Sequence, residues 1–523
     1  MTIAEEAPKA TRREWLGLAV LALPCLLYSM DLTVLNLAVP QLSADLKPSA
    51  AQLLWIVDIY GFMVAGALIT MGTLGDRIGR RKLLLIGAAA FGVASVLAAF
   101  STSAEMLIAT RALLGIAGAT LAPSTLSLIR NMFLDGRERS FAIGIWIASF
   151  SAGAAIGPLV GGLLLEYFWW GSVFLVGVPV MVLLLILGPL MLPEFRDPDA
   201  GRIDLASAVL SLAAVLAMIY GIKHMAEHGP GWQAAAAILA GIGLGTVFVR
   251  RQKNLADPLV DLRLFRSPVF SASLAINILG FLFLVGSFLF IGLYFQLVVG
   301  LSPLQAGIWS LPSALAFILG SMIVPLVAHR FPPARVMTAG LAVAAAGFAL
   351  LMRIEVDGSL ALVVAASVIF SLGFTPVVAM TTDLIVSSAP PERAGSAAAM
   401  SETSIEFGGA LGIAILGSIV TAIYRSEMAQ ALPAGIPPEA ARIATATLGG
   451  AVAEAALLPA ELAASLVAVA REAFVAGMQF SALVAMLGLF ATALAALVLL
   501  RGAPPAASEA VAAKTVSEDA VVL

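Results

Sequence analysis

The stretch Gly72-Thr-Leu-Gly-Asp-Arg-Ile-Gly-Arg-Arg-Lys82 decides the fold class of this chain. Apolar runs lie on both sides of it, roughly over 53–71 and 83–100. Each run is about 20 residues long, the length that a helix needs to cross ~30 Å of hydrocarbon. Four of the last six residues of the stretch are cations, which is typical of a cytoplasmic turn between two spans. The turn therefore predicts a membrane protein.

The same turn carries glycines and one acid whose role the sequence leaves open. The glycines permit close helix contacts and unusual backbone angles, and they are Gly72, Gly75 and Gly79. Asp76, the only acid, can cap a helix or pair locally. The cations that follow it are Arg77, Arg80, Arg81 and Lys82. An ordinary basic loop between two spans explains these residues as well as a specific functional motif does.

The composition extends the prediction to the whole chain. Of the 523 residues, 61% are hydrophobic and 12% are charged, whereas soluble domains have roughly 25% charged residues. This indicates a polytopic membrane protein. The one cysteine, Cys25, excludes an intramolecular disulfide and a cysteine metal cluster. The apolar run from Trp15 to Val39 is too long for the core of a signal peptide, so we expect it to remain as the first helix.

Hydropathy predicts an all-α membrane protein with fourteen spans. With the N-terminus inside, these spans leave 22 of the 29 Lys and Arg residues in cytoplasmic segments and six in outer loops, and Arg111 lies inside a span. One missed helix would invert every later loop, so the split supports the count and two cytoplasmic termini. The predicted spans are 15–39, 53–72, 83–101, 105–129, 141–165, 171–192, 204–222, 232–249, 269–297, 306–328, 335–352, 359–386, 398–424 and 474–500.

A weak internal repeat divides twelve of these spans into two halves. Residues 48–87 can be aligned without gaps with the region that ends at Gly340. Both regions have the same order of span, basic turn and span. Asp58 then falls opposite Leu311, so the second half lacks an acid that the first half carries. The predicted segments are an N-terminal six-helix bundle (1–192), a two-helix insert (193–268), a C-terminal six-helix bundle (269–501) and a disordered cytoplasmic tail (502–523).

The C-terminal bundle includes a long outer loop, residues 425–473. This loop is rich in Ala and shows helical patterning near 438–448 and 459–474. We expect it to form short helices that pack on the outer face.

Ionisable residues inside spans are energetically expensive, so each is a candidate for function. The candidates are Asp31, Asp58, Glu402, Glu406 and Arg111. Glu402 and Glu406 are four residues apart and share one helix face. Two carboxylates so close should not both ionise easily, which suits a proton carrier. Structural roles stay open, because Asp31 and Asp58 can form hydrogen bonds between helices and Arg111 can pair with an acid or cap carbonyl groups.

Four acids and one base inside the spans favour a cavity that attracts cations or protons rather than anions. Aromatic side chains could stack on an organic cation, although core packing or contact with lipid would explain most of them individually. The aromatic candidates for such a cavity are Trp55, Tyr60, Trp146, Phe150, Tyr294 and Trp309.

Span 5 contains a glycine strip, Gly153-Ala-Ala-Ile-Gly-Pro-Leu-Val-Gly-Gly162. Glycines four residues apart form a helix face on which a neighbouring helix can pack closely, and the proline permits a kink. A packing strip alone is common in membranes, but the full order of residues is more specific. Its members are Gly153, Gly157, Pro158, Gly161 and Gly162.

One segment matches a zinc-protease pattern. His224-Met-Ala-Glu-His228 fits His-x-x-Glu-His, but it lies at the outer end of span 7 and has no third ligand nearby. The sequence has no phosphate-binding loop, nucleophile elbow or ATPase signature. We therefore expect no metal site, no cofactor and no enzymatic activity.

Together these motifs resemble the fourteen-helix drug:proton antiporter branch of the major facilitator superfamily, in particular exporters of quaternary ammonium compounds, methyl viologen and dyes. The resemblance covers nearly the whole chain. The segments that carry it are Ser29–Asn36, Trp55–Tyr60, Gly72–Lys82, Arg111–Gly115, Gly157–Pro158 and Ser401–Glu406.

The resemblance implies rocking-bundle exchange, in which protons enter as a lipophilic cation leaves. It implies that the 72–82 turn latches the outward-facing state, with Asp76 at a helix N-terminus or beside an arginine such as Arg137. It ties Arg111 to proton transfer and the span-5 strip to antiport rather than symport. Span 10 departs from relatives that transport divalent cations, because it carries no acid here.

The favoured hypothesis is a proton-driven exporter of lipophilic organic cations in a bacterial-type inner membrane. Its substrates would be quaternary ammonium compounds, dyes and biguanide-like antiseptics. Its partners would be protons, these cations and the bilayer, with no nucleic acid, and we expect a monomer. Two alternatives stay open. One is a metabolite or lipid exporter of the same fold, and the other is a membrane scaffold or metalloenzyme that uses the His224–His228 end.

Overall fold

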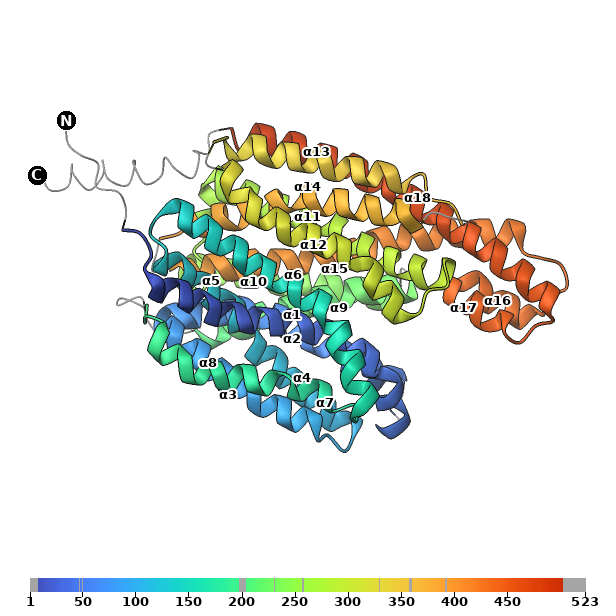
Figure 1. Ribbon diagram of the computed structural model, residues 1–523, viewed down its shortest axis with the longest axis horizontal. Coiled ribbons are helices and arrows are strands. Elements are labelled where there is room, and N and C mark those ends of the chain that lie inside the picture. Colours follow the sequence, from blue (N-terminus) through green and yellow to red (C-terminus); the bar gives the residue numbers. More distant parts are fainter. Residues whose placement is uncertain are drawn as a thin grey trace, which may run out of the picture.

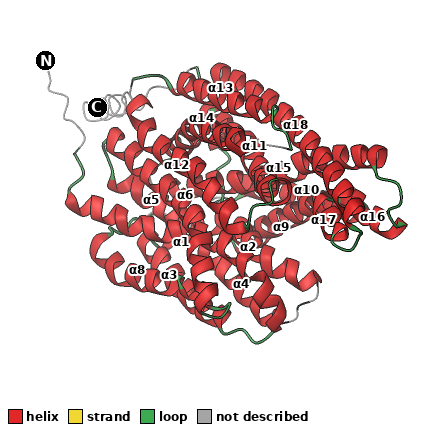
Figure 2. Ribbon diagram, turned by 45° about the vertical axis from the view of Figure 1, so that its right-hand side comes forward, coloured by secondary structure: helices red, strands yellow, loops and turns green. Residues whose placement is uncertain are grey.

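In the computed structural model, every regular element of the described residues is a helix (Figure 2). The structure describes residues 8–46, 48, 50–196, 204–229, 231–255, 258–328, 330–356, 360–390 and 393–501. Within these ranges thirteen helical segments are long and apolar enough to cross a membrane, and one further helix has a shorter apolar stretch, Ala206–Ile222. The all-α prediction is therefore confirmed for the described part of the chain.

The first group of helices corresponds to the first six predicted spans. Its fourth span is two helices in sequence, and Pro123 lies in the first turn of the second, where a missing N–H costs no helical hydrogen bond. The helices are α1 (Arg12–Leu46), α2 (Ala50–Ile78), α3 (Arg80–Ala99), α4 (Ala104–Gly118), α5 (Leu121–Met132), α6 (Gly136–Tyr167), α7 (Ser172–Leu175) and α8 (Gly177–Met191).

The remaining helices follow in the predicted order. Two of them, α9 (Leu205–His228) and α10 (Trp232–Asn254), correspond to the expected insert. After them come η1 (Leu264–Arg266), α11 (Pro268–Leu293), the π-helical η2 (Tyr294–Val298), α12 (Pro303–Ala328), α13 (Pro333–Leu351), α14 (Leu360–Ser387), α15 (Ala394–Ala431), α16 (Pro438–Ala446), α17 (Leu448–Ala455) and α18 (Ala460–Leu499).

These helices pack as two groups with a seam between them (Figure 1). Helices α1 to α8 contact one another, and α11 to α15 pack with α18 in the same way. The two groups, which we call the N-terminal and C-terminal halves, meet mainly where α2 packs on α15 and α6 packs on α12. Helix α9 packs on both α2 and α15, and α10 packs mainly on α9. The insert therefore covers one of the two contacts between the halves.

Large apolar side chains point away from the bundle on many of its helices. Such residues would be costly in water, but a bilayer would cover them. Examples that are more than half exposed are Val93 on α3, Leu163 on α6, Leu239 on α10, Leu326 on α12 and Leu494 on α18. Their distribution over both halves and the insert fits a protein surrounded by lipid.

We call the end of the bundle that holds residues 72–82 the turn end. Near it, the backbone N–H of Ala10 donates to Oε2 of Glu138 in the first turn of α6 (2.6 Å). Thr338 Oγ1, in the first turns of α13, donates to the carbonyl oxygen of Ala493 near the end of α18 (3.2 Å). The start of α1 and the end of α18 lie on the same side of the molecule (Figure 1).

At the opposite end, α15 and α18 extend beyond the other helices, and α16 and α17 lie beside them (Figure 1). The short helix expected near 438–448 is present as α16, which Tyr424 Oη holds through the carbonyl oxygen of Ala444 (2.7 Å). The prediction of a separate short helix over 459–474 was wrong, because this segment is the start of α18. No proline or glycine interrupts the chain between Ala460 and Phe474, so the helix continues into the span.

Candidate functional site

The acid of α1 and the buried arginine of α4 form an ion pair. Arg111 Nη1 lies 3.3 Å from Asp31 Oδ2, and only 1% of the Arg111 side chain is exposed. Arg111 Nη2 also donates to the carbonyl oxygen of Val57 on α2 (3.4 Å). Both structural roles considered for Arg111, pairing with an acid and capping a carbonyl group, are thus present at one side chain.

Tyr60, on α2, lies against this ion pair. The guanidinium carbon of Arg111 is 5.1 Å from the centre of the Tyr60 ring, a cation–π distance. Tyr60 is fully buried, and its hydroxyl group has no hydrogen-bond partner among the described residues. Gly118 leaves room for it, because a Cβ at this glycine would lie only 3.1 Å from Tyr60 Oη.

The two glutamates lie on α15, in the other half of the molecule. Glu402 is 6% exposed, and within the described ranges it forms no ion pair and its Oε1 accepts no hydrogen bond. Glu406, one helical turn later, accepts a hydrogen bond from the hydroxyl group of Tyr28 on α1 (3.4 Å). This bond joins the acids of the C-terminal half to the helix that carries Asp31.

Four aromatic side chains form a connected group that reaches both the ion pair and Glu406. The ring centre of Tyr28 is 6.2 Å from that of Tyr60 and 5.6 Å from that of Phe150 on α6. The Trp146 ring lies 4.7 Å from Phe150, and its Nε1 donates to Thr125 Oγ1 (2.9 Å). We call Tyr28, Tyr60, Trp146 and Phe150 the aromatic cluster. It contacts Arg111 on one side and Glu406 on the other.

The structure does not bring the other aromatic candidates to this cluster. Trp55 and Trp309 are each 42% exposed. Tyr294 is buried, but its hydroxyl group donates to the carbonyl oxygen of Glu355 (2.6 Å), in the loop after α13. Asp58 belongs to α2, and its side chain lies outside the described residues.

Asp76, in the 72–82 turn, lies at the start of α15. Its carboxylate accepts hydrogen bonds from the backbone N–H groups of Gly395 (3.3 Å) and Ser396 (3.1 Å). The N-terminus of a helix carries partial positive charge, which favours an anion there. Asp76 also forms an ion pair with Arg80, one turn later. Both arrangements considered for Asp76 are combined, and the arginine is Arg80 rather than Arg137.

Small residues allow α2 to approach α15 closely at this point. A Cβ on Gly72 would lie 2.5 Å from the Cβ of Ala399, and a Cβ on Gly395 would overlap the guanidinium group of Arg80. A Cβ on Gly75 would lie 2.6 Å from Arg80 Nη1. Larger residues at these glycines would therefore separate the two helices or displace the buried arginine.

The rest of the turn fixes the start of α3. Gly79 separates α2 from α3 with a φ of 112°, a conformation that favours glycine. The backbone N–H of Arg81 donates to Glu194 Oε1 (3.0 Å), and its Nη1 donates to the carbonyl oxygen of Leu192 (2.9 Å). Arg77 lies half-buried in the last turn of α2. These contacts stay within the N-terminal half, in contrast to those of Asp76.

Two further arginines join the halves at the turn end. Arg130 on α5 donates to the carbonyl oxygens of Val386 and Ala389 at the end of α14. Arg139 on α6 lies 3.6 Å from Asp383 on α14. Residues more than 240 positions apart meet here because the two bundles are folded against each other. Basic loop residues alone do not reveal such partners.

The glycine strip of α6 faces α1 at its first member. A Cβ on Gly153 would overlap the carbonyl oxygen of Leu26, so only glycine fits. A Cβ on Gly162 would meet no atom within 4 Å. The side chain of Pro158 lies outside the described residues. The other buried members of the strip are Gly157 and Gly161.

The zinc-protease lookalike is described only at its first residue. The ring of His224 stacks on Tyr220 at 5.7 Å, and its Nε2 lies 3.2 Å from Gln233 Oε1. The side chains of Glu227 and His228 lie outside the described residues. The described residues contain no group of three His, Cys, Asp or Glu side chains that could hold a metal ion.

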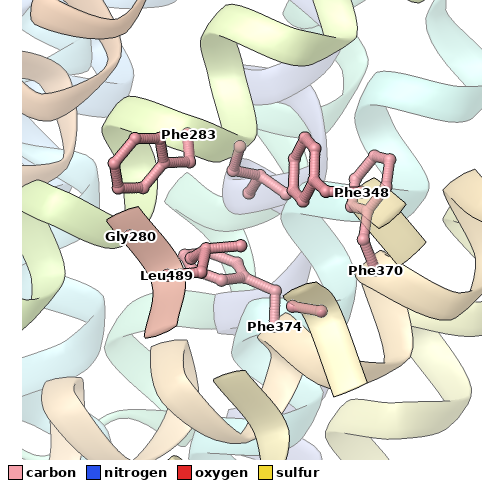
Figure 3. A pocket seen from close by; sticks show the side chains of 8 residues that line it. Gly280, Phe283, Phe348, Phe370, Phe374 and Leu489 are labelled. Atoms are coloured by element: carbon pink, nitrogen blue, oxygen red, sulfur yellow. The ribbon is translucent and has the colours of Figure 1, made fainter. Parts of the chain in front are cut away.

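A narrow apolar void lies within the C-terminal half (Figure 3). It is bounded by α11, α13, α14 and α18, and its lining carries no charged side chain, so it offers no counter-charge for a cation. The lining residues are Gly280, Phe283, Leu284, Ala344, Phe348, Phe370, Phe374 and Leu489.

Comparison with known proteins agrees with this architecture. Residues 21–413 match the Major Facilitator Superfamily. The chain is 46% identical over 495 residues to the multidrug efflux pump LfrA of Mycolicibacterium smegmatis, covering 94% of this chain and 98% of that protein. It is 36% identical over 466 residues to the methyl viologen resistance protein SmvA of Salmonella typhimurium, covering 88% and 93%.

Among solved structures, the human organic anion transporter MFSD10 (TETRAN) has a similar fold. The TM-score is 0.56 at 15% sequence identity, and the match covers 91% of this chain and 99% of that one. At this identity the likeness concerns the fold alone. Together with the family match over most of the chain and the two bundles of apolar helices, it leads to one conclusion. The chain belongs to the major facilitator superfamily, and it is a multi-pass membrane transporter rather than an enzyme.

Proposed function

We propose that this transporter is a proton-coupled antiporter that exports lipophilic organic cations across the cytoplasmic membrane of a bacterial cell. The observation that carries the proposal is Glu402, a carboxylate that is buried without an ion-pair partner among the described residues. It lies one helical turn before Glu406, which contacts the aromatic cluster through Tyr28. Two relatives, a multidrug efflux pump and a methyl viologen resistance protein, support the drug-efflux part of it.

The chemistry of this region suits a flat or bulky cation. Aromatic faces attract quaternary ammonium groups and dye rings, and nearby carboxylates supply the counter-charge. A buried carboxylate without a partner is stable only when it is protonated or when a cation lies beside it. Protons and organic cations would therefore compete for the glutamates of α15, and this competition is the basis of antiport. Quaternary ammonium compounds, dyes and biguanide-like antiseptics have the required charge and apolar surface.

The ion pair of the N-terminal half supplies the second element of the mechanism. Asp31 is held by Arg111, and Arg111 contacts Tyr60, which in turn lies beside Tyr28. A proton that reached Asp31 would neutralise it and release Arg111. The packing of the aromatic cluster would then change next to Glu406. One inward proton gains ~2.3 kcal/mol per 100 mV, and one outward monovalent cation loses the same amount, so the pH difference across the membrane would drive a one-for-one exchange.

The topology that we propose has fourteen spans in a six, two and six arrangement, with the turn end in the cytoplasm. Thirteen helical segments are long enough to span, and α9, at 24 residues, is about 36 Å long and can supply the fourteenth. The start of α1 and the end of α18 lie on one side, which fits an even number of crossings. With Asp76 bound to α15, the structure then corresponds to a state closed to the cytoplasm.

The test uses purified protein in liposomes with an imposed proton gradient, and it follows the movement of ethidium. We expect gradient-dependent movement by the wild type and none by Asp31→Asn. The control is Glu439→Gln on α16, whose acid lies exposed beside Arg442, and it should transport normally. Elution of each variant as a single species from a sizing column would show that it is folded.

Two results would overturn the proposal. Gradient-driven movement by Asp31→Asn at the wild-type rate would remove the role of that acid. No movement of ethidium or other organic cations by the wild type would favour the alternative, a metabolite or lipid exporter of the same fold.

A further inference from the structure

The loop between α10 and α11 contacts both halves beside Asp76. The carbonyl oxygen of Leu259 accepts a hydrogen bond from Thr73 Oγ1 on α2 (2.8 Å) and another from Ser396 Oγ on α15 (3.2 Å). Thr73 lies three residues before Asp76, and the N–H of Ser396 is one of the groups bound to Asp76. One carbonyl group of the insert thus joins the same two helices that Asp76 joins.

The side chain of Gln252, on α10, holds this loop in place. It is 2% exposed, and its Oε1 accepts hydrogen bonds from the backbone N–H groups of Leu259 (2.7 Å) and Val260 (3.4 Å). Its Nε2 donates to Ser207 Oγ on α9 (2.7 Å). Both ends of the buried amide are therefore used, and the loop is fixed to the two helices of the insert.

Most other contacts of the loop are with the C-terminal half. Asp261 Oδ2 accepts a hydrogen bond from Arg393 Nη1, directly before α15 (3.3 Å). Leu259 and Val260 are buried in an apolar group that shares side chains with α11, α14 and α15, namely Leu274, Ile385, Ala397 and Met400. The loop is thus attached to the C-terminal half, and among the described residues its hydrogen bond with the N-terminal half comes from Thr73.

We infer that the two-helix insert acts as a second latch of the closed turn end, with Gln252 as the positioning residue and the carbonyl group of Leu259 as the contact. The inference rests on the proposed alternation between two states. When the halves separate at the turn end, the bond from Thr73 to Leu259 breaks together with the bonds of Asp76. The insert would therefore favour the closed state through these hydrogen bonds at the turn end.

The test compares two threonines with the same kind of contacts. Thr73 Oγ1 donates to Ile69 O in its own helix and to Leu259 O in the loop of the insert. Thr338 Oγ1 donates to Ala334 O in its own helix and to Ala493 O within the C-terminal half. Thr73→Val and Thr338→Val remove the same hydroxyl group at nearly constant shape, but only the first removes a bond between the N-terminal half and the loop of the insert.

The measurement is the distance between spin labels at the turn end, in purified full-length protein without substrate. The labels are attached at Leu134→Cys and Phe331→Cys, two exposed positions in different halves, with Cys25→Ser in all variants. We expect Thr73→Val to raise the ratio of the long-distance to the short-distance population about five-fold, which is the factor expected for the loss of one hydrogen bond. Gln252→Leu should shift it in the same direction, and Thr338→Val should leave it at the wild-type value.

Asp76→Asn serves as the positive control, because it weakens the first latch directly. A shift by Asp76→Asn without any shift by Thr73→Val would overturn the role of the insert while leaving the alternation intact. An equal shift by Thr73→Val and Thr338→Val would also overturn it, since the effect would then be general. The distances are measured without transport, so a failure of the ethidium experiment would not change this outcome.

Discussion

Each half carries an acid on a long apolar helix, but the surroundings of the two acids differ. Asp31, in the N-terminal half, lies 3.3 Å from Arg111, so its charge is balanced within the protein. Glu402, in the C-terminal half, is buried without an ion pair among the described residues. A balanced pair is mainly a structural and switching element, whereas an unbalanced carboxylate requires a proton or a cation from outside. Under the proposed function, ligand exchange would take place on α15, and α1 and α4 would control it.

The largest effect should come from unbalancing the pair of the N-terminal half. Arg111→Ala leaves Asp31 buried without its partner, which costs about 3–5 kcal/mol in buried ion pairs. We expect a large fall in the melting temperature of the detergent-purified protein. Asp31→Asn in the same chain should recover most of it, because the amide needs no counter-charge. If the double variant is no more stable than Arg111→Ala, Arg111 stabilises the protein through packing, and balancing the charge of Asp31 is not its main role.

The opposite result is expected from neutralising the acid of the C-terminal half. Glu402→Gln removes a charge that has no partner, so the melting temperature should stay the same or rise. Gradient-driven ethidium movement should fall at least ten-fold, since one site of competition between protons and cations is lost. Thermal unfolding and the liposome assay, run on the same preparation, check the stability and the transport parts of this prediction. A stability loss as large as that of Arg111→Ala would show that Glu402 is a structural acid.

A smaller effect should follow from breaking the link between the two acidic regions. Tyr28→Phe keeps the ring but removes the hydrogen bond from Tyr28 Oη to Glu406. We expect a transport rate lower by a few-fold, at nearly unchanged affinity for ethidium, because the aromatic surface remains. The control is Tyr424→Phe, which removes a bond to Ala444 within the C-terminal half. Equal rates for the two variants would argue against coupling through Tyr28.

The smallest effect concerns an ion pair that is more exposed to solvent. A hydrogen bond from Arg251 to Asp204 at the start of α9 (2.6 Å) holds the pKa of that carboxyl group well below its ordinary value. The contribution of this contact to stability is thus complete above about pH 4 and is lost as the pH falls through the lowered pKa. Asp204→Asn should lower the melting temperature slightly at neutral pH.

The difference between Asp204→Asn and the wild type should disappear in acid, as thermal unfolding over a pH series would show. A large loss at neutral pH would mean that surface pairing matters here as much as the buried pair of Arg111 and Asp31. In general, exposed ion pairs contribute much less than buried contacts do when one partner is removed.

Much of the fold could be predicted because a membrane restricts the chain strongly. Hydrophobic length places the helices, and each predicted span overlaps a helix or two successive helices of the structure. The error in the outer loop has a clear cause. Hydropathy falls over residues 459–474, but helix formation does not require a hydrophobic surface, so α18 begins 14 residues before the predicted span. Polarity marks the edge of the membrane rather than the end of a helix.

The candidate site could be predicted only in part. The cost of burying charge singled out Asp31, Arg111 and the glutamates from sequence alone. The same reasoning gave no sign that Tyr28 would contact Glu406, since a tyrosine in an apolar helix carries no such cost. Three of the aromatic candidates, Trp55, Tyr294 and Trp309, were chosen by residue type and lie elsewhere, because type does not tell which face of a helix meets the seam.

The sequence by itself determined the class of protein, the order and approximate length of its helices, and the small set of charges that the bilayer would make expensive. The reason is that these properties depend on the transfer of individual side chains from water, which the local sequence defines. Only the tertiary structure decided the partners: Asp31 with Arg111, Tyr28 with Glu406, and Asp76 with the start of α15. Those contacts join helices up to 378 residues apart, and they exist because two bundles pack along a seam whose register no local pattern specifies.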